Sequence, residues 1–232
     1  MNKYRNAGAF AVTLCALFLL CSGVLAAQGS AEIQDLSKIA SGGGWKIYNR
    51  GATAIEDGAR KAIRLDQRQG DGVVLLQGSR FANGTIELDI RGKDLFQQSF
   101  VGIAFHATDE RNYDAIYFRP FNFKNPDPVR SNHAVQYVSH PEYTWQKLRT
   151  EKPEQYEKPV RPVPDPNGWF HVRVVVASPK ISVYVEGANE PCLTVEKLGV
   201  RREGMFGLMV GNGSGGDFAN LKILPAAGAK SK

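Results

Sequence analysis

Residues 85–91 alternate strictly between polar and apolar side chains, and no other feature limits the fold of this chain as strongly. In an extended strand, Ile86, Leu88 and Ile90 point to one side and the polar residues between them point to the other. Such a strand lies with one side against a core and the other in water. Similar segments recur at short and even intervals, which favours an all-β domain.

The turns between these segments have the chemistry of β-hairpins. Asn83-Gly84 and Asp57-Gly58 supply residues that adopt positive φ, as tight hairpin turns require. Antiparallel strands of this length must close or pack as two sheets, because exposed edges invite aggregation. Only residues 30–39 show helical periodicity. The further predicted strands are 45–48, 52–56, 61–66, 72–76, 101–106, 113–119, 134–138, 170–177, 181–186, 193–198, 205–210 and 218–224.

Two long proline-containing insertions interrupt these strands, at residues 121–132 and 139–168. Loops of this length inside a compact domain usually carry a function or stay disordered. Their aromatic residues, which include Phe121, Trp145 and Tyr156, favour packing against the domain.

The N-terminus has the pattern of a secretory signal. Lys3 and Arg5 precede an apolar run over residues 9–20, and small residues follow it. The run is shorter than the about 20 apolar residues of a membrane span. We therefore predict a signal peptide at 1–27, export to the periplasm or the extracellular space, and no stable membrane span after signal removal.

The rest of the chain divides into three parts. Three consecutive glycines, at 42–44, end a short polar segment, and no linker-like composition follows them. We predict a flexible lead-in at 28–44, a single β-domain at 45–224 and a disordered tail at 225–232. Signal removal would leave Cys192 as the only cysteine, so the stability of the domain must come from its core.

The chain carries a formal net charge of +6 at neutral pH. The Lys and Arg residues responsible are spread over the sequence and form no compact run. Because nucleic-acid binding uses a basic patch or stripe, we expect no nucleic-acid partner.

The richest candidate for a ligand site lies between His106 and Tyr137. Alternation over 113–119 places Tyr117 and Arg119 on one face of a strand. The same reasoning places His133 with Tyr137 on one face of the next segment, and Gln136 on the other. On the preceding strand, residues 102, 104 and 106 share a face, and the small Gly102 and Ala104 leave a depression there.

Aromatic rings beside planar polar groups are the chemistry of sugar recognition. Rings stack on the apolar face of a pyranose, and amide or guanidinium groups bind its hydroxyls. The alternative is that these are ordinary strand aromatics and surface ion pairs. The predicted ligand-binding residues are Tyr117, Arg119, Asn122, His133, Gln136, Tyr137 and Trp145.

Two histidines are candidates for catalysis. Imidazole titrates near neutral pH, so His106 or His133 could remove a proton from carbon as a general base. The four histidines of the chain are not spaced as zinc ligands, so we expect no zinc site.

Asp217 follows the glycine-rich stretch 211–216. Its carboxylate and the turn carbonyls could hold a structural calcium ion. A tight turn explains the same glycines equally well.

The chain resembles the concanavalin A-like lectin/glucanase jelly-roll superfamily in the succession FANGTIELDIRG, SFVGIAFHATDERNYDAIYFRPFNF, HAVQYV, GWFHVRVVV, ISVYVEG and GMFGLMVGNGSGGDFANLKI. More narrowly, it resembles secreted bacterial domains related to laminin G-like modules and to the 3-keto-disaccharide hydrolase family. The resemblance covers about residues 45–224 and implies a two-sheet antiparallel jelly-roll sandwich. This superfamily includes lectins, glucanases, lyases and adhesion modules.

The chain departs from both families at one motif each. Glucanases of this fold carry Glu-x-Asp-x-x-Glu on one strand. Here Glu87 and Asp89 are followed by Ile90-Arg91-Gly92, so the third carboxylate is absent and we interpret the two acids as a solvated strand face. The Asn-Ser-Gly-Ile strand usual in the hydrolase family is replaced by residues 99–103.

The sequence therefore predicts an exported domain that binds carbohydrate through the residues around Tyr117 and Arg119. A second hypothesis is a hydrolase or lyase that acts on glycosides or 3-keto-glycosides. A third is a laminin G-like module in which the proline-rich loop 153–166 contacts a protein partner.

Overall fold

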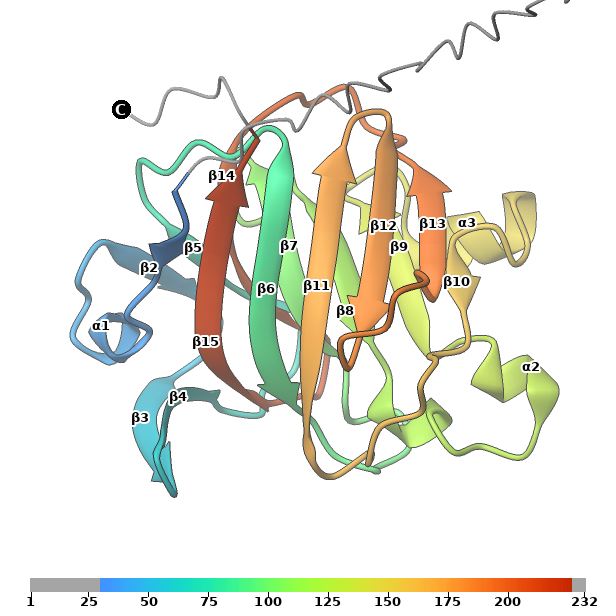
Figure 1. Ribbon diagram of the computed structural model, residues 1–232, viewed down its shortest axis with the longest axis horizontal. Helices are drawn as coiled ribbons and strands as arrows, with labels where there is room; N and C mark the ends of the chain where they lie inside the picture. Colours follow the sequence, from blue (N-terminus) through green and yellow to red (C-terminus); the bar gives the residue numbers. More distant parts are fainter. Residues whose placement is uncertain (1–29, 227–232) are drawn as a thin grey trace, which may run out of the picture.

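The computed structural model describes residues 30–226, which form two antiparallel sheets packed face to face (Figure 1). This architecture confirms the predicted jelly-roll sandwich. The predicted signal peptide and residues 227–232 of the predicted tail lie outside the described residues. Pro225 is the last residue of a strand rather than the start of a tail.

The first sheet, here called the back sheet, has eight strands in the order β13-β12-β11-β6-β15-β4-β3, with β1 paired to β15. Its strands are β1 (Glu32–Ile33), β3 (Ala52–Asp57), β4 (Arg60–Leu65), β6 (Gly84–Arg91), β11 (Trp169–Ala177), β12 (Lys180–Val185), β13 (Leu193–Glu196) and β15 (Gly216–Pro225).

The second sheet, here called the cavity sheet, has seven strands in the order β10-β9-β8-β7-β14-β5-β2. Its strands are β2 (Trp45–Tyr48), β5 (Gly72–Leu76), β7 (Val101–Ala107), β8 (Asp114–Phe118), β9 (Val135–Ser139), β10 (Glu157–Lys158) and β14 (Met205–Val210).

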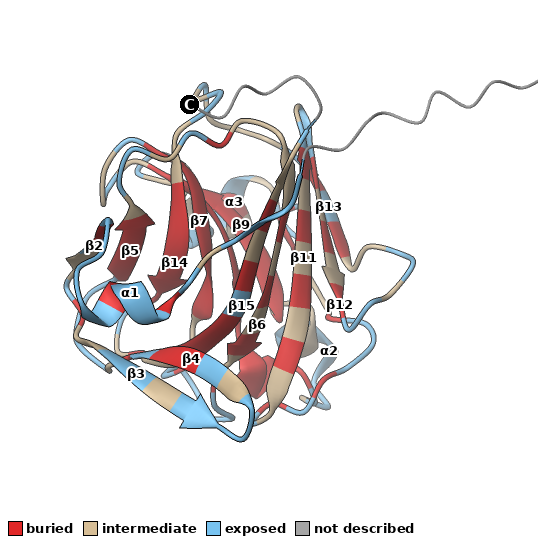
Figure 2. Ribbon diagram, turned by 60° about the vertical axis from the view of Figure 1, so that its left-hand side comes forward, coloured by how far each residue is buried: buried red, intermediate tan, exposed pale blue. Residues whose placement is uncertain are grey.

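The core lies between the two sheets, and buried residues run along the strands of both (Figure 2). Ile86, Leu88 and Ile90 of β6 are buried, as their alternation predicts. The rings of Phe118 in the cavity sheet and Phe170 in the back sheet meet edge to face, with centroids 5.3 Å apart. Burial of these apolar side chains is the main force that holds the sheets together.

The prediction that residues 28–44 form a flexible lead-in is wrong for the part that the structure describes. Glu32 and Ile33 of β1 pair with Ile223 and Lys222 of β15. Leu36, just before the short helix α1 (Ser37–Ala40), and Ile39, within it, are buried in the core. The apolar side chains on this segment therefore make it part of the sandwich.

The two insertions fold onto the domain and contain short helices that periodicity alone did not indicate. The first carries the 3-10 helix η1 (Pro120–Asn122) and α2 (Pro128–Ser131). The second carries α3 (Trp145–Glu151) and the strand β10. The side chain of Thr144 accepts a hydrogen bond from the backbone N–H of Lys147 and so caps α3. Within residues 30–226, no helix is long and apolar enough to cross a membrane.

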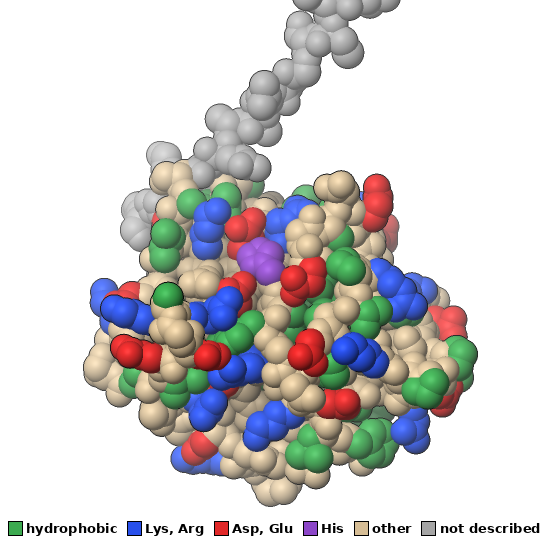
Figure 3. All heavy atoms as spheres, turned by 60° about the horizontal axis from the view of Figure 1, so that its bottom comes forward, with side chains coloured by type: hydrophobic (Ala, Val, Ile, Leu, Met, Phe, Trp, Pro, Cys, Tyr) green, Lys and Arg blue, Asp and Glu red, His purple; other side chains and the backbone are tan. Residues whose placement is uncertain are grey.

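Charged side chains are interspersed on the face that Figure 3 shows. Lys and Arg lie beside Asp and Glu across this face, and the view contains no continuous patch of one sign. This face therefore offers no charged patch for a ligand.

Candidate functional site

A cavity of about 690 Å³ lies on the outer face of the cavity sheet. Tyr117 of β8, Val138 of β9 and Met209 of β14 line it. Each alternates along its strand with a core residue, for example Phe118 next to Tyr117, so the cavity is on the side away from the back sheet. Helix α3 and the loops around η1 and α2 contribute further lining residues.

The buried guanidinium of Arg119 organises the floor of this cavity. Its Nη1 donates to the backbone oxygen of His133 at 2.8 Å, and its Nη2 donates to the hydroxyl of Tyr117 at 2.7 Å. Nη2 also donates to Oε1 of Gln136, which accepts a second hydrogen bond from the Tyr117 hydroxyl at 3.1 Å. Four residues from two strands and their flanking loops thus share one network.

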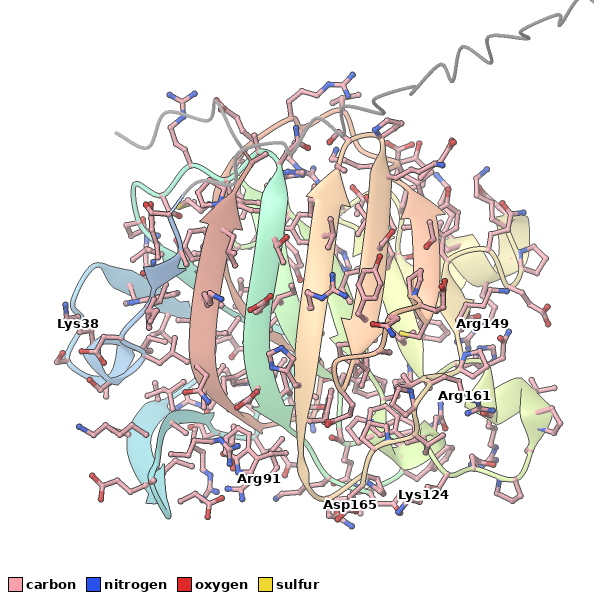
Figure 4. All side chains as sticks on the ribbon, in the orientation of Figure 1. Lys38, Arg91, Lys124, Arg149, Arg161 and Asp165 are labelled. Carbon is pink, nitrogen blue, oxygen red and sulfur yellow. The ribbon has the colours of Figure 1, made fainter. Side chains whose placement is uncertain are left out.

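Glu157 adds a buried carboxylate to this floor. Nε and Nη2 of Arg149 donate to its two oxygens at 2.9 and 2.7 Å, and Arg119 Nη1 lies 3.7 Å from Oε2. In Figure 4, Arg149 lies near α3. Arg91 lies far from it, at the lower end of β6. Sequence analysis missed Glu157 and Arg149, because both lie in the irregular second insertion and no periodic pattern marks them.

His133 stands beside the same carboxylate. Its Nδ1 lies 2.8 Å from Oε2 of Glu157, although the two atoms are not aligned as a hydrogen bond. Burial lowers the pKa of His133 below 6.5, and the positive charges of Arg149 and Arg119 act in the same direction. Glu157 opposes this shift. The lowered pKa favours the neutral imidazole, and the nearby carboxylate favours a proton on Nδ1 through its charge rather than through an aligned hydrogen bond.

Besides His133 Nδ1, which faces Glu157, two buried polar atoms at the floor have no partner in the protein. They are Oδ1 of Asn122 and Nε2 of Gln136. Hydrogen bonds fix both amides: Asn122 Nδ2 donates to the backbone oxygen of His133, and Gln136 Oε1 accepts from two donors. The floor therefore holds one free acceptor on Asn122, which lines the cavity, and one free donor on Gln136, which is bonded to the lining residues Tyr117 and Arg119.

The structure brings most of the predicted ligand-binding residues together. Tyr117, Arg119, Asn122, His133 and Trp145 line the cavity, and Gln136 is bonded to two of them.

Tyr137 does not reach the cavity, and its predicted place beside His133 is wrong. Its side chain is buried in the core, where its hydroxyl accepts a hydrogen bond from the backbone N–H of Leu198. β9 begins only at Val135, so strand alternation does not extend back to His133.

His106 is also absent from the cavity, which contradicts the prediction that it could act there as a base. It is completely buried, with Nε2 2.7 Å from the backbone oxygen of Ala82 and Nδ1 3.0 Å from Asp114. A positive φ of 50° at His106 and a register shift between β7 and β14 break the alternation that placed it beside Ala104.

Asp217 does not fit a calcium ion. Arg64 donates to both of its oxygens, at 2.7 and 2.9 Å, and Arg91 donates twice to Oδ2. Burial alone would raise the pKa of Asp217, but the two guanidinium groups lower it. Across residues 30–226, no group of three or more His, Cys, Asp or Glu could hold a metal. The carboxylate is an ion-pair partner at the edge of a second cavity of about 370 Å³.

Glu87 and Asp89 make ion pairs on the outer face of the back sheet. Glu87 lies 3.4 Å from Lys222, and Asp89 contacts His171 at 2.9 Å and Arg60 at 3.3 Å. They therefore take no part in the cavity on the opposite sheet.

Comparison with known proteins identifies relatives of the whole domain. The model of the family described as 3-keto-alpha-glucoside-1,2-lyase-like domain matches residues 38–224. No curated protein sequence matches the chain.

Solved structures share the fold at low sequence identity. A carbohydrate-binding module from Bacillus subtilis, CBM66, has a TM-score of 0.53 and 18% identity, over 78% of this chain and 95% of that one. A Bacillus subtilis protein with a galectin-like fold has a TM-score of 0.55 and 11% identity, over 86% and 96%. The Ca²⁺-bound exoplasmic/lumenal domain of VIP36 has a TM-score of 0.54 and 13% identity, over 87% and 91%. At these identities the similarity shows the fold alone.

The charge arrangement at the floor predicts how His133 responds to Glu157→Gln. The substitution removes the one group that raises the pKa of His133 and leaves the two arginines that lower it. The pKa of His133 should therefore fall further below 6.5, as an NMR titration of the imidazole protons would measure.

His171 serves as the internal control in the same spectra. Its pKa is raised by the hydrogen bond to Asp89 on the other sheet, so the variant should leave it unchanged. An unchanged or increased pKa of His133, with His171 titrating as before, would contradict this account of the floor.

Proposed function

We propose, since this chain belongs to the family of 3-keto-alpha-glucoside-1,2-lyase-like domains, that the cavity on its seven-stranded sheet binds a glycoside. The observation that carries the proposal is the floor around Arg119, where buried polar groups converge beside aromatic rings.

The two free amide atoms support a ligand rich in hydroxyls. A buried polar group without a partner costs about 1–3 kcal/mol, and a bound hydroxyl would remove that cost. Oδ1 of Asn122 would accept a hydrogen bond from a sugar hydroxyl, and Nε2 of Gln136 would donate one to a sugar oxygen. Because Arg119 holds Gln136 in place, little ordering is needed on binding.

The aromatic side chains support a ligand with apolar ring faces. Phe100, Tyr117 and Trp145 all line the cavity. The C–H faces of a pyranose stack on such rings, while its equatorial hydroxyls reach polar groups at the side. The shared fold of a carbohydrate-binding module is consistent with this use of the sandwich.

Export remains part of the proposal. The signal-like N-terminus would place the domain in the periplasm or outside the cell, where glycosides from the surroundings are met first.

Replacement of Trp145 by Ala should weaken binding of methyl 3-keto-alpha-glucoside about tenfold or more, because the variant loses a stacking surface at the cavity. Isothermal titration calorimetry with the purified domain measures this change.

Trp169→Ala is the matched control. Trp169 belongs to β11 in the back sheet and does not line the cavity, so this variant should bind the glycoside as the wild type does. Equal affinities in all three proteins would remove Trp145 from the site.

A second candidate function is cleavage of a 3-keto-glycoside, favoured by the neutral His133 beside Glu157 in the cavity. The 3-keto group acidifies the hydrogen on C2. Nε2 of His133 would take this proton, and the electron pair would form the C1–C2 double bond. The C1–O bond would break, and the departing oxygen would take up a proton to give the free alcohol. Glu157 would stabilise the imidazolium that forms.

His133→Gln separates binding from cleavage. If His133 is the base, the variant should lose about 10²–10⁴-fold in turnover while it still binds the ligand. NMR spectra of methyl 3-keto-alpha-glucoside, recorded over hours with each protein, follow both the broadening of ligand signals and the growth of product signals.

His171→Gln, on the back sheet, should turn over like the wild type. Turnover that survives in His133→Gln would exclude this base. Binding without turnover in the wild type would leave a lectin-like module, and the absence of both would favour the laminin G-like hypothesis of a protein partner.

A further inference from the structure

A row of four aromatic rings leads from the floor of the cavity to its mouth. The ring of Tyr117 contacts Phe100, with centroids 6.2 Å apart, and Phe100 contacts Phe121 at 5.5 Å. Phe121 in turn contacts Phe96 at 5.6 Å. All three contacts are edge to face, and all four residues line the cavity. We call this set the aromatic row.

The two ends of the aromatic row differ in exposure, and the half-buried ring of Phe100 lies between the buried rings of Tyr117 and Phe121. Tyr117 is 4% exposed and Phe121 8%, whereas Phe96 is 51% exposed. A phenylalanine ring that is half in water leaves apolar surface that a ligand can cover, and covering it favours binding.

The loop that carries Phe96 is held in place by hydrogen bonds. The backbone N–H of Lys93 donates to Ser99 Oγ at 2.9 Å, and that of Asp94 donates to the side chain of Asn167 at 2.8 Å. The backbone N–H of Gln98 closes the loop onto Leu95 O at 3.0 Å. The guanidinium of Arg130 lies over the Phe96 ring, 4.8 Å from its centroid. The exposed ring is therefore positioned before any ligand binds, which reduces the entropy lost on binding.

We propose that the mouth of the cavity, formed by Phe96 and Phe121, holds the aglycone of the ligand, and that this aglycone is an aromatic ring. The inference rests on the proposed function, in which the sugar occupies the floor beside Arg119 and Gln136. The aromatic row then continues from the sugar to the group attached to it.

The polar atoms that lack a partner are gathered at the floor, and the rings at the mouth favour an aromatic group over a second sugar. Among residues 30–226, the buried side-chain atoms without a partner include Asn122 Oδ1, His133 Nδ1 and Gln136 Nε2, which belong to the floor, and two atoms of Ser178 and Arg201, which do not line the cavity. The side chains of Phe96 and Phe121 offer a second sugar no hydrogen bond. A hydroxyl placed against these two rings would lose water without replacement, so a second sugar would depend on Gln97 and Arg130, which also line the cavity, whereas an aromatic ring needs no such partner.

The test compares three ligands that share one sugar: methyl, phenyl and glucosyl 3-keto-alpha-glucoside. Every protein carries His133→Gln, so that the probes stay intact, and calorimetry gives the three dissociation constants. With no other change, the phenyl ligand should bind about tenfold more tightly than the methyl ligand. Addition of Phe96→Ala should abolish this preference and leave the affinity for the methyl ligand unchanged.

Leu95→Ala is the matched control, because Leu95 is the neighbouring residue, is 43% exposed and does not line the cavity. It should keep the full preference for the phenyl ligand. Equal affinities for the three ligands, or a preference for the glucosyl ligand, would overturn the aromatic assignment and leave the proposed function standing. Failure of all three ligands to bind, both with and without His133→Gln, would overturn both.

Discussion

The burial of one guanidinium group, that of Arg119, determines the character of the cavity. A buried charge is tolerated only when hydrogen bonds and opposite charge replace the lost water. Arg119 meets this requirement with the His133 carbonyl, the Tyr117 hydroxyl, the Gln136 amide oxygen and the nearby carboxylate of Glu157. Because the amide oxygen of Gln136 is held by two donors, its nitrogen is left free. The charge that stabilises the floor thus also orients the group that would meet a ligand.

The two insertions create the cavity that this floor needs. The outer face of a sheet in a sandwich is open to water, but here α3 and the loops around η1 and α2 stand on the outer face of the cavity sheet. Arg149 of α3 donates two hydrogen bonds to Glu157 of β10. This ion pair joins two parts of the second insertion next to Arg119. The outer face of the back sheet carries ion pairs such as that of Asp89 with His171, and the smaller cavity at Asp217. The asymmetry between the sheets comes from the insertions.

Sequence reasoning was accurate where strand periodicity applies and failed where the backbone departs from it. The alternation over 85–91 predicted β6 and its buried face, and alternation along β8 placed Tyr117 with Arg119. The positive φ at His106 turned that residue away from the cavity. His133 lies before the start of β9 at Val135, so the strand alternation that includes Tyr137 does not apply to it. Glu157 belongs to a two-residue strand in an irregular segment, and only the folded chain shows that it lies beside Arg119.

Binding of a glycoside at this floor requires that the ligand reach the free amide of Gln136. A titration of the ¹⁵N-labelled domain with methyl 3-keto-alpha-glucoside, followed through the side-chain NH₂ signals, measures this contact. We expect the Gln136 signals to shift saturably, because Nε2 gains a hydrogen bond, while those of Asn167 at the second cavity stay in place. Binding that moves the signals of Asn167 and leaves those of Gln136 unchanged would place the ligand elsewhere and contradict the account.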